Sequence, residues 1–458
     1  MTSTTTASKA NLKNYALVTL AYWGFTLTDG ALRMLVLLYF NEIGYTPLQI
    51  ASLFLFYEIF GVVTNFLGGW IGSLMGLKLT LYAGIGLQIL ALVMLSLLNR
   101  DWAQWMAIAY VMTAQAFSGI AKDLTKMSSK SAIRLVVPQD AQSSLFKWVA
   151  VLTGSKNALK GIGFFMGAAL LATLGFVNAL GVMAAGLFVV LLTGFFLPKG
   201  MGKTKAKTKF TQLFSKSQEI NILSAARFFL FGSRDVWFVV GLPVFLRSVL
   251  GWSFFEAGGF LACWVIGYGA VQFLAPVVLS RFNGGQAPTS KTIQFWTFTL
   301  TVVPAAIAIA LQLGLPAGQV IVIGLTVFGI VFAFNSAVHS YLVLAFTDDD
   351  KVALNVGFYY MANSGGRLIG TVLSGLVYQL AGLVGCLWVS TLFVLAAGVI
   401  SMKLPDPQPT KAIAWKPEME INRWVPTQSK SGKASPTLSF FERYLTLCLS
   451  ADCLLVSP

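Results

Sequence analysis

The stretch PKGMGKTKAKTKFTQLFSKSQ, residues 198–218, divides the chain into two halves of similar character. It carries six lysines and no acid, whereas the sequence on either side of it is strongly apolar. Apolar runs of about 20 residues, long enough to cross a bilayer as helices, recur six times before it and six times after it. The expected spans are 14–40, 48–74, 79–98, 103–121, 147–172 and 176–197, then 220–247, 254–280, 290–312, 317–346, 353–380 and 383–402.

The composition excludes most other classes of protein. Of the 458 residues, 56% are hydrophobic and 11% are charged, and the mean hydropathy is +0.75. A soluble domain carries about 25% charged residues, so neither a water-soluble enzyme nor a disordered chain is expected. We expect an all-α membrane protein whose twelve transmembrane helices form two pseudo-symmetric six-helix halves. The predicted divisions are a cytoplasmic N-terminus (1–13), the first bundle (14–197), the basic linker (198–218), the second bundle (219–403) and a cytoplasmic tail (404–458).

The net charge of +15 is interpreted first as membrane topology. With a cytoplasmic N-terminus, the inner connections hold eighteen Lys and Arg residues, and the outer loops hold two, Arg100 and Arg247. This asymmetry predicts a multi-pass protein of the plasma (inner) membrane with both termini in the cytoplasm. The linker is then a solvated loop beside anionic lipid headgroups, so the lipid bilayer is an expected partner and nucleic acid is not.

Nine ionisable side chains fall inside the predicted spans, where an unpaired charge is costly. Six are basic and three are acidic, which leaves a formal +3 that calls for a counter-anion. The basic residues are Arg33, Lys156, Lys160, Arg227, Arg234 and Arg367, and the acidic ones are Asp29, Glu58 and Asp235.

Several of these charges lie at similar depth in corresponding helices. Arg33, Lys160, Arg234 and Arg367 fall within about 9 Å of the membrane midplane at 1.5 Å per residue, and KGIG at 160–163 echoes RLIG at 367–370. A repeat of this kind places its substrate site between the halves. The hypothesis is therefore a central site in which five residues bind an anionic substrate and three acids couple or gate transport. The predicted binding residues are Arg33, Lys156, Lys160, Arg234 and Arg367, and the coupling residues are Asp29, Glu58 and Asp235.

Structural roles compete with this hypothesis. Asp29 and Arg33 are spaced i, i+4 and are expected to neutralise each other as a pair. Lys156 and Lys160 share a helix face, where like charges repel, and no acid lies in their helix, so they are the hardest to explain structurally.

Three further interpretations concern mainly helices of the second half. Arg234 and Asp235 are adjacent and are expected to point to different faces. Arg227, like Glu58 of the first half, lies off the midplane, and His339 lies toward the cytoplasmic end of its helix, so these three side chains are expected to be wetted. Glu58, Asp235 and His339 are candidate proton carriers, the histidine because its ordinary pKa is near neutrality.

Signals for other chemistry are absent from the sequence. The four cysteines form no CxxC or Cys/His cluster, so no metal site is expected. No nucleotide-binding fingerprint or nucleophile–base arrangement occurs, so we expect no cofactor, no enzyme activity and no ATP-driven pump. The tail, 404–458, has an apolar stretch interrupted by charges and favours an interfacial helix over a thirteenth span.

Four long strings closely resemble the ArsJ-type organoarsenical efflux permeases, which belong to the major facilitator superfamily. The resemblance covers roughly residues 11–405 and does not extend into the tail. The strings are YWGFTLTDGALRMLVLL (22–38), FLFYEIFGVVTNFLGGW (54–70), SGIAKDLTKMSSKSAIRLVVPQD (118–140) and LTGSKNALKGIGFFMG (152–167).

The resemblance implies the superfamily fold and secondary active efflux of 1-arseno-3-phosphoglycerate, which confers arsenate resistance. Glyceraldehyde-3-phosphate dehydrogenase makes this compound when arsenate replaces phosphate, so a functional link to that enzyme is implied. A small polyanion agrees with the cationic interior. Two alternatives stay open: an organophosphate/phosphate antiporter, to which the placement of Arg33 and Arg234 is similar, and a non-transporting membrane sensor that acts through its C-terminal tail.

Overall fold

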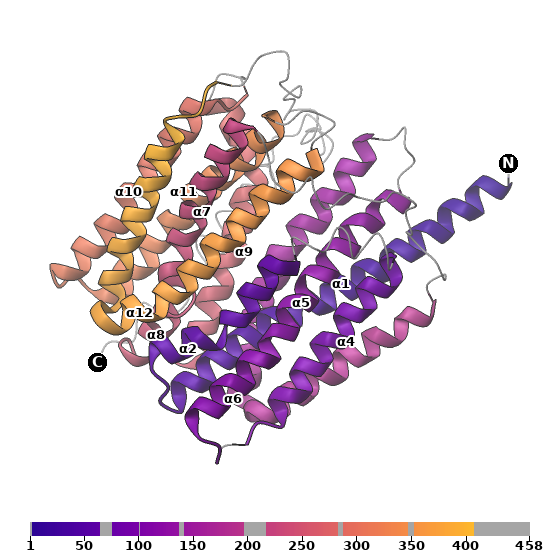
Figure 1. The fold of residues 1–458 in the computed structure, drawn as a ribbon, viewed down its shortest axis with the longest axis horizontal. Coiled ribbons are helices and arrows are strands. Elements are labelled where there is room, and N and C mark those ends of the chain that lie inside the picture. Colours follow the sequence, from indigo (N-terminus) through magenta and orange to yellow (C-terminus); the bar gives the residue numbers. More distant parts are fainter. Residues whose placement is uncertain are drawn as a thin grey trace, which may run out of the picture.

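The structure, a computed structural model, describes residues 2–64, 76–99, 101–136, 142–196, 217–282, 287–346 and 352–406. Within these ranges the chain is helical and contains no strand, and the first half lies beside the second (Figure 1). The first half comprises α1 (Thr2–Glu42), α2 (Pro47–Leu53), a further helical stretch at 55–64, α4 (Leu77–Ser96), α5 (Gln104–Val136), α6 (Gln142–Leu192) and the 3-10 turn η1 (Thr193–Phe196). The second comprises α7 (Gln218–Phe238), α8 (Gly241–Ser248), α9 (Phe254–Phe282), α10 (Ser290–Gln312), α11 (Ala317–Ala345) and α12 (Val352–Ser401).

The long helix α6 is a hairpin of two limbs that meet at Gly175. This glycine has φ 73° and ψ 177°, a conformation that breaks a helix and that residues with a Cβ avoid. Before the break, Ser155 accepts a hydrogen bond from Trp23 of α1. After it, Val190 packs against the neighbouring Gly24. Residues 35 positions apart therefore lie beside the same turn of α1, and the limbs are the expected spans 147–172 and 176–197.

The helix α12 is built in the same way, with its break at Gly382 (φ 61°, ψ −162°). Before the break, Gly366 packs against the backbone of Phe228 in α7. After it, the ring of Phe393 lies 5.4 Å from that of Phe229. The limbs are the expected spans 353–380 and 383–402, so each half ends in an equivalent hairpin packed on the first helix of that half. We call the end of the bundle that holds the Gly175 and Gly382 turns the distal end, and the opposite end the proximal end.

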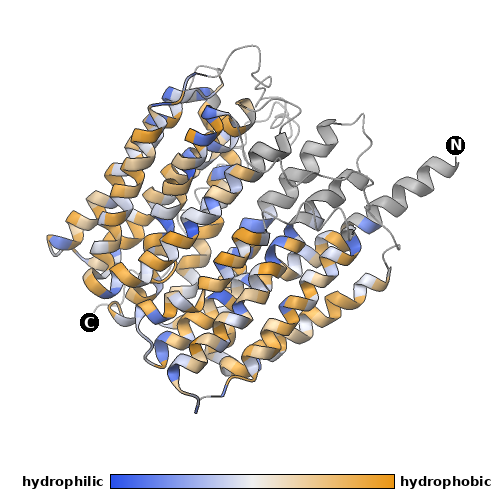
Figure 2. Cartoon of the chain, in the orientation of Figure 1, coloured by the Kyte–Doolittle hydropathy of each residue, from blue (hydrophilic) through white to orange (hydrophobic). Residues whose placement is uncertain are grey.

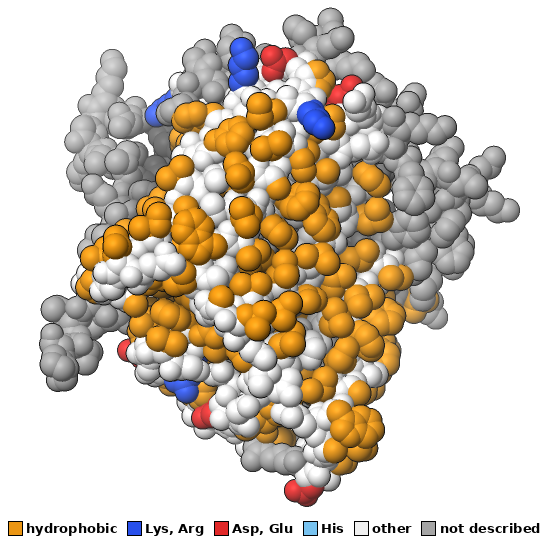
Figure 3. Space-filling model, turned by 60° about the vertical axis from the view of Figure 1, so that its left-hand side comes forward, with side chains coloured by type: hydrophobic (Ala, Val, Ile, Leu, Met, Phe, Trp, Pro, Cys, Tyr) orange, Lys and Arg blue, Asp and Glu red, His pale blue; other side chains and the backbone are white. Residues whose placement is uncertain are grey.

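Described helices lie in all twelve expected spans, and residues 65–74 of the span 48–74 are outside the described ranges. Eight segments of the described chain are long and apolar enough to cross a membrane, and two of them are the hairpins. The remaining expected spans, 14–40 and 103–121, lie in α1 and α5, which are less apolar on average than most of the other long helices. Hydrophobic residues dominate the length of the helices (Figure 2) and cover the middle of the outer face, with the visible charges toward the ends (Figure 3). The all-α architecture with two six-helix halves is confirmed.

Three boundaries differ from the predicted ones. The helix α1 begins at Thr2 instead of residue 14. The helix α5 continues to Val136, so Lys122 and Lys126, expected in a connecting loop, are helical; no Pro or Gly follows them before residue 137 to stop the helix. The span 220–247 is divided into α7 and α8, and Ser374 Oγ accepts hydrogen bonds from both backbone amides at the break, 3.1 Å each.

The halves meet closely through small residues. Along α6 and α9, a Cβ atom at Gly161 would lie 2.8 Å from the carbonyl oxygen of Ala262. Between α12 and α2, a Cβ at Gly375 would lie 2.4 Å from that of Ala51. Small residues let helix backbones approach closely. Such packing is needed in a bilayer, because burying apolar side chains against another helix has no advantage over burying them against lipid. The contacts bring the charged faces of the two halves together.

Candidate functional site

A single carboxylate joins the two halves at the centre of the bundle. Glu58 follows α2 and is 1% exposed. Its Oε1 accepts from Arg33 Nη2 of its own half at 3.2 Å and from Arg367 Nη2 of the other half at 2.8 Å. Both are charge-assisted hydrogen bonds, which are stronger than neutral ones. Two of the predicted binding residues and one predicted coupling residue are therefore in direct contact.

A second buried carboxylate extends this cluster within the second half. Asp235, 1% exposed, accepts from Arg367 Nε at 3.1 Å and from Arg234 Nε at 2.7 Å. The expectation that Arg234 and Asp235 point to different faces is wrong, because the long arginine side chain folds around the helix to reach its neighbour. Arg367 thus lies between two carboxylates, one from each half.

Asp29 also pairs differently from the expectation. The i, i+4 contact with Arg33 is not formed; Asp29 Oδ1 accepts instead from the Tyr57 hydroxyl at 2.7 Å. Tyr57 and Glu58 are consecutive, so one helical segment satisfies Asp29 with its hydroxyl and Arg33 with its carboxylate. Arg33 lies over the Phe54 ring at 5.3 Å as well. Tertiary partners have replaced the local pair.

Lys160 lies beside this cluster on the first limb of α6. Its backbone carbonyl faces Gly30 of α1, where a Cβ would lie 2.8 Å away, so the lysine is next to Asp29 along the helix interface. Its Nζ lies 5.6 Å from the centre of the Phe164 ring, and no carboxylate in the described ranges is within ion-pairing distance of it. Lys156 is one turn earlier on the same limb and is partly buried.

The residues Asp29, Arg33, Glu58, Tyr57, Lys160, Arg234, Asp235 and Arg367 form what we call the central cluster. It contains four cations and three carboxylates, so it keeps a formal +1 although its arginines are paired. Such an arrangement can exchange an internal carboxylate for an external anion, because arginine forks bind carboxylate and phosphate alike.

The sequence interpretation missed a buried acid in α5. Asp123 is 0% exposed, and Lys126 Nζ lies 3.5 Å from it. Lys122 Nζ lies 4.0 Å from the centre of the Tyr57 ring, which connects this group to the central cluster. The signal that could have found them is the i, i+3 spacing of Asp123 and Lys126 in a stretch without helix breakers.

The expectation that Arg227, Glu58 and His339 are wetted is also wrong, and Glu58 is only 1% exposed. Arg227 is 5% exposed and His339 is 0% exposed. Arg227 donates to Asn363 and Ser336. Neither ring nitrogen of His339 has a hydrogen-bond partner among the residues that the structure describes. The side chains of Arg227 and His339 are inside the bundle on the proximal side of the central cluster.

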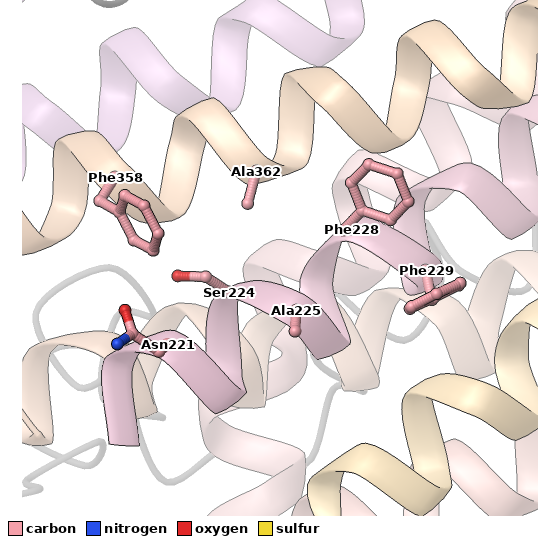
Figure 4. A pocket seen from close by; sticks show the side chains of 7 residues that line it. All are labelled: Asn221, Ser224, Ala225, Phe228, Phe229, Phe358 and Ala362. Atoms are coloured by element: carbon pink, nitrogen blue, oxygen red, sulfur yellow. The ribbon is translucent and has the colours of Figure 1, made fainter. Parts of the chain in front are cut away.

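A cavity of about 330 Å³ opens between α7 and α12 (Figure 4). Its lining carries no charged side chain, so it does not suit a small anion. The Ser224 hydroxyl is buried there without a hydrogen-bond partner in the described ranges. The lining residues are Asn221, Ser224, Ala225, Phe228, Phe229, Phe358 and Ala362.

No protein-family model and no curated protein matches the sequence, but the fold is similar to solved transporters. The nucleoside transporter NupG is 17% identical, with a TM-score of 0.63 over 86% of this chain and 98% of that one. A POT family transporter in complex with a thioalcohol-conjugated peptide is 15% identical, with a TM-score of 0.67 over 84% and 94%. A bacterial homologue of the iron transporter ferroportin, in an outward-facing state, is 15% identical, with a TM-score of 0.61 over 85% and 98%. The chain has the fold of major facilitator superfamily transporters.

Proposed function

We propose that this protein is a secondary transporter of a small organic anion that works by alternating access. The observation that carries the proposal is the ion bridge in which Glu58 of the first half joins Arg33 to Arg367 of the second half. In this fold the substrate site lies near the membrane midplane between the halves, which is where the predicted depth puts Arg33 and Arg367. A site with arginines from both halves suits an anion.

The bridge suggests how an anion enters the site. Without substrate, Glu58 pairs with Arg33, which contacts no other carboxylate in the described ranges, and with Arg367, which also contacts Asp235. Leaving Arg33 buried and unpaired would cost several kcal/mol. A phosphate or arsenate group can displace the carboxylate and take both forks. Protonation of Glu58 would free the same forks, which offers a route for coupling anion transport to protons. Asp235 has the equivalent relation to Arg234 and Arg367, so either carboxylate can serve as the switch.

The substrate we propose is 1-arseno-3-phosphoglycerate, exported to give arsenate resistance. Its support is the resemblance of four long strings to the ArsJ-type permeases, together with the cationic character of the central cluster. The solved structures of similar fold are named for a nucleoside, a peptide and iron, so the fold alone leaves the substrate open. Export from the cytoplasm across the inner membrane, cytoplasmic termini and the link to glyceraldehyde-3-phosphate dehydrogenase belong to the same proposal.

The direct test is uptake by everted membrane vesicles. The vesicles are supplied with the dehydrogenase, its triose phosphate substrate, NAD and radiolabelled arsenate, and parallel vesicles receive radiolabelled phosphate. We expect label to accumulate with arsenate and not with phosphate, and a protonophore to abolish accumulation if protons drive it. Stimulation by phosphate loaded inside the vesicles would favour the organophosphate/phosphate antiporter. Equal label with both oxyanions would contradict the proposed substrate.

The residue-level test removes single cationic charges. Lys160→Ala and Arg367→Ala are expected to abolish arsenate resistance while the protein remains in the membrane. The matched control is Lys291→Ala, at an exposed position in the first turn of α10, which removes the same charge far from the cluster and should leave resistance intact. Resistance at the original level in both cluster variants would overturn the cationic site.

A further inference from the structure

Arg227 of α7 is a buried arginine, and its hydrogen-bond partners in the described ranges are all neutral. Its Nε donates to Asn363 Oδ1 of α12 at 3.1 Å, and its Nη1 donates to Ser336 Oγ of α11 at 3.2 Å. The guanidinium carbon lies 3.8 Å from the centre of the Phe231 ring, which is a stacked cation–π contact. These contacts fix the position and orientation of the guanidinium group.

Its electrostatic situation differs from that of the central cluster. Each arginine there contacts a carboxylate, whereas no carboxylate in the described part of the chain lies within ion-pairing distance of Arg227. Its Nη2 also has no hydrogen-bond partner among those residues, although a guanidinium has five N–H donors to place. A cation kept unpaired inside a membrane protein is costly and is characteristic of a functional site.

The surrounding side chains can complete a site for an anion. His339 lies three residues after Ser336 in α11 and has two unpartnered ring nitrogens, of which at least one carries a hydrogen. Gln272 of α9 donates to Ser336 Oγ at 3.3 Å, and Asn157 of the first half donates to Gln272 at 3.4 Å. The group is therefore rich in donors, lacks acids and connects both halves.

Phe231 links this group to the central cluster. Arg227 lies over its ring at 3.8 Å and Arg234 at 5.1 Å, so the two guanidinium carbons are at most about 9 Å apart, each in cation–π range of the same ring. Their seven-residue separation corresponds to nearly two helical turns, which puts both on one face of α7. A short molecule with an anionic group at each end can engage both arginines at once.

We propose that Arg227, with Asn363, Ser336 and His339, forms a second anion subsite, which binds one anionic end of the substrate while the central cluster binds the other. The inference rests on the proposed function and adds to it the place where the second anionic group of a compact, doubly anionic substrate binds. A substrate with one anionic group would leave the subsite empty and bind more weakly.

The test compares 3-phosphoglycerate, which has a carboxylate and a phosphate on a three-carbon chain, with inorganic phosphate. Binding is measured calorimetrically with the full chain in phosphatidylcholine nanodiscs. The unmodified protein should bind 3-phosphoglycerate at least about tenfold more tightly than phosphate. Arg227→Gln should weaken 3-phosphoglycerate binding about 10- to 100-fold and change phosphate binding less than about threefold.

The matched control is Arg247→Gln. Arg247 lies over Phe254 at 4.0 Å and donates to the Trp252 carbonyl oxygen, so its local chemistry is like that of Arg227, but it is in α8 at the distal end. The Arg247→Gln variant should bind both ligands as tightly as the unmodified protein does. His339→Leu removes no hydrogen bond among the described residues, so it should fold even if Arg227→Gln does not, and it should weaken 3-phosphoglycerate binding about threefold or more.

The outcomes separate the two proposals. Equal loss of both ligands in Arg227→Gln, or no loss in a folded variant, would overturn the second subsite and leave the central cluster in place. Equal affinities of the unmodified protein for phosphate and 3-phosphoglycerate would also overturn the second subsite and leave the central cluster in place. Failure of the unmodified protein to bind either anion would contradict the proposed function itself. Selective loss of 3-phosphoglycerate binding supports both.

Discussion

The carboxylate of Glu58 should compete with the substrate for the arginines that it joins. Substituting Glu58→Gln keeps an oxygen acceptor of the same shape and removes the negative charge. We expect this variant to bind inorganic phosphate more tightly than the unmodified protein does, because the incoming anion no longer has to displace a carboxylate from Arg33 and Arg367. The charge of the central cluster rises from a formal +1 to +2 by the same change.

The magnitude follows from the contacts. Glu58 accepts two charge-assisted hydrogen bonds, at 3.2 and 2.8 Å, and each such bond contributes about 1.5–3 kcal/mol. The amide oxygen of glutamine retains part of the free energy of both hydrogen bonds. The carboxylate therefore stabilises the two arginines more than the amide does by about the free energy of one such bond. That difference corresponds to about 10- to 100-fold in an equilibrium constant. Phosphate binding should tighten by a factor in this range.

The assay is calorimetric titration of phosphate into nanodiscs that hold the full chain, accompanied by vesicle transport with and without a proton gradient. Glu42→Gln, at an exposed position near the end of α1, removes the same charge outside the cluster and should change binding less than about twofold. Proton-driven uptake should be lost in Glu58→Gln if this carboxylate carries the proton. Unchanged or weaker phosphate binding in a folded Glu58→Gln protein would refute the competition argument.

Three further predictions concern packing, a buried hydroxyl and the tail. Gly366→Ala should sharply reduce the amount of folded protein, because its Cβ would lie 2.0 Å from the carbonyl oxygen of Phe228. Gly186 has open space around it, so Gly186→Ala should be neutral or stabilising by up to about 1 kcal/mol. Fluorescence-detected size exclusion after heating measures the folded fraction of both variants. Tyr57→Phe leaves one oxygen of buried Asp29 unpaired and should destabilise the protein by about 1–3 kcal/mol, seen as a lower thermal midpoint. Deletion of residues 407–458 should leave vesicle transport intact, and loss of transport would favour the sensor alternative.

The arrangement of spans could be predicted because it depends on local composition. Each run of apolar residues must satisfy its backbone within itself to enter a bilayer, and the short breaks at Gly175 and Gly382 interrupt the apolar runs in the sequence. The continuation of α5 to Val136 was not predictable from hydropathy, because a helix does not end where it leaves the hydrocarbon. A span that ends at residue 121 therefore leaves Lys122 and Asp123 outside the predicted bundle, whereas both lie within α5.

The pairing of the charges could be predicted only in part. The predicted depth in the membrane identified Arg33, Arg234 and Arg367, but it put Glu58, which joins two of them, off the midplane. The i, i+4 rule chose the wrong partner for Asp29. Glu58 is 25 positions from Arg33 and 309 from Arg367, and no local pattern contains such contacts. The same holds for Arg227, whose neutral environment comes from α11 and α12.

The sequence by itself therefore determined that the chain is a membrane bundle of two repeated halves with excess positive charge in its interior, since hydropathy and charge are properties of each segment. Only the tertiary structure decided which charges are neutralised, which carboxylates join the halves and which arginine is left with neutral neighbours. Those outcomes depend on how closely α1, α6, α7 and α12 approach one another, and that approach is set by glycines such as Gly163 and Gly370 packing against helices remote in sequence.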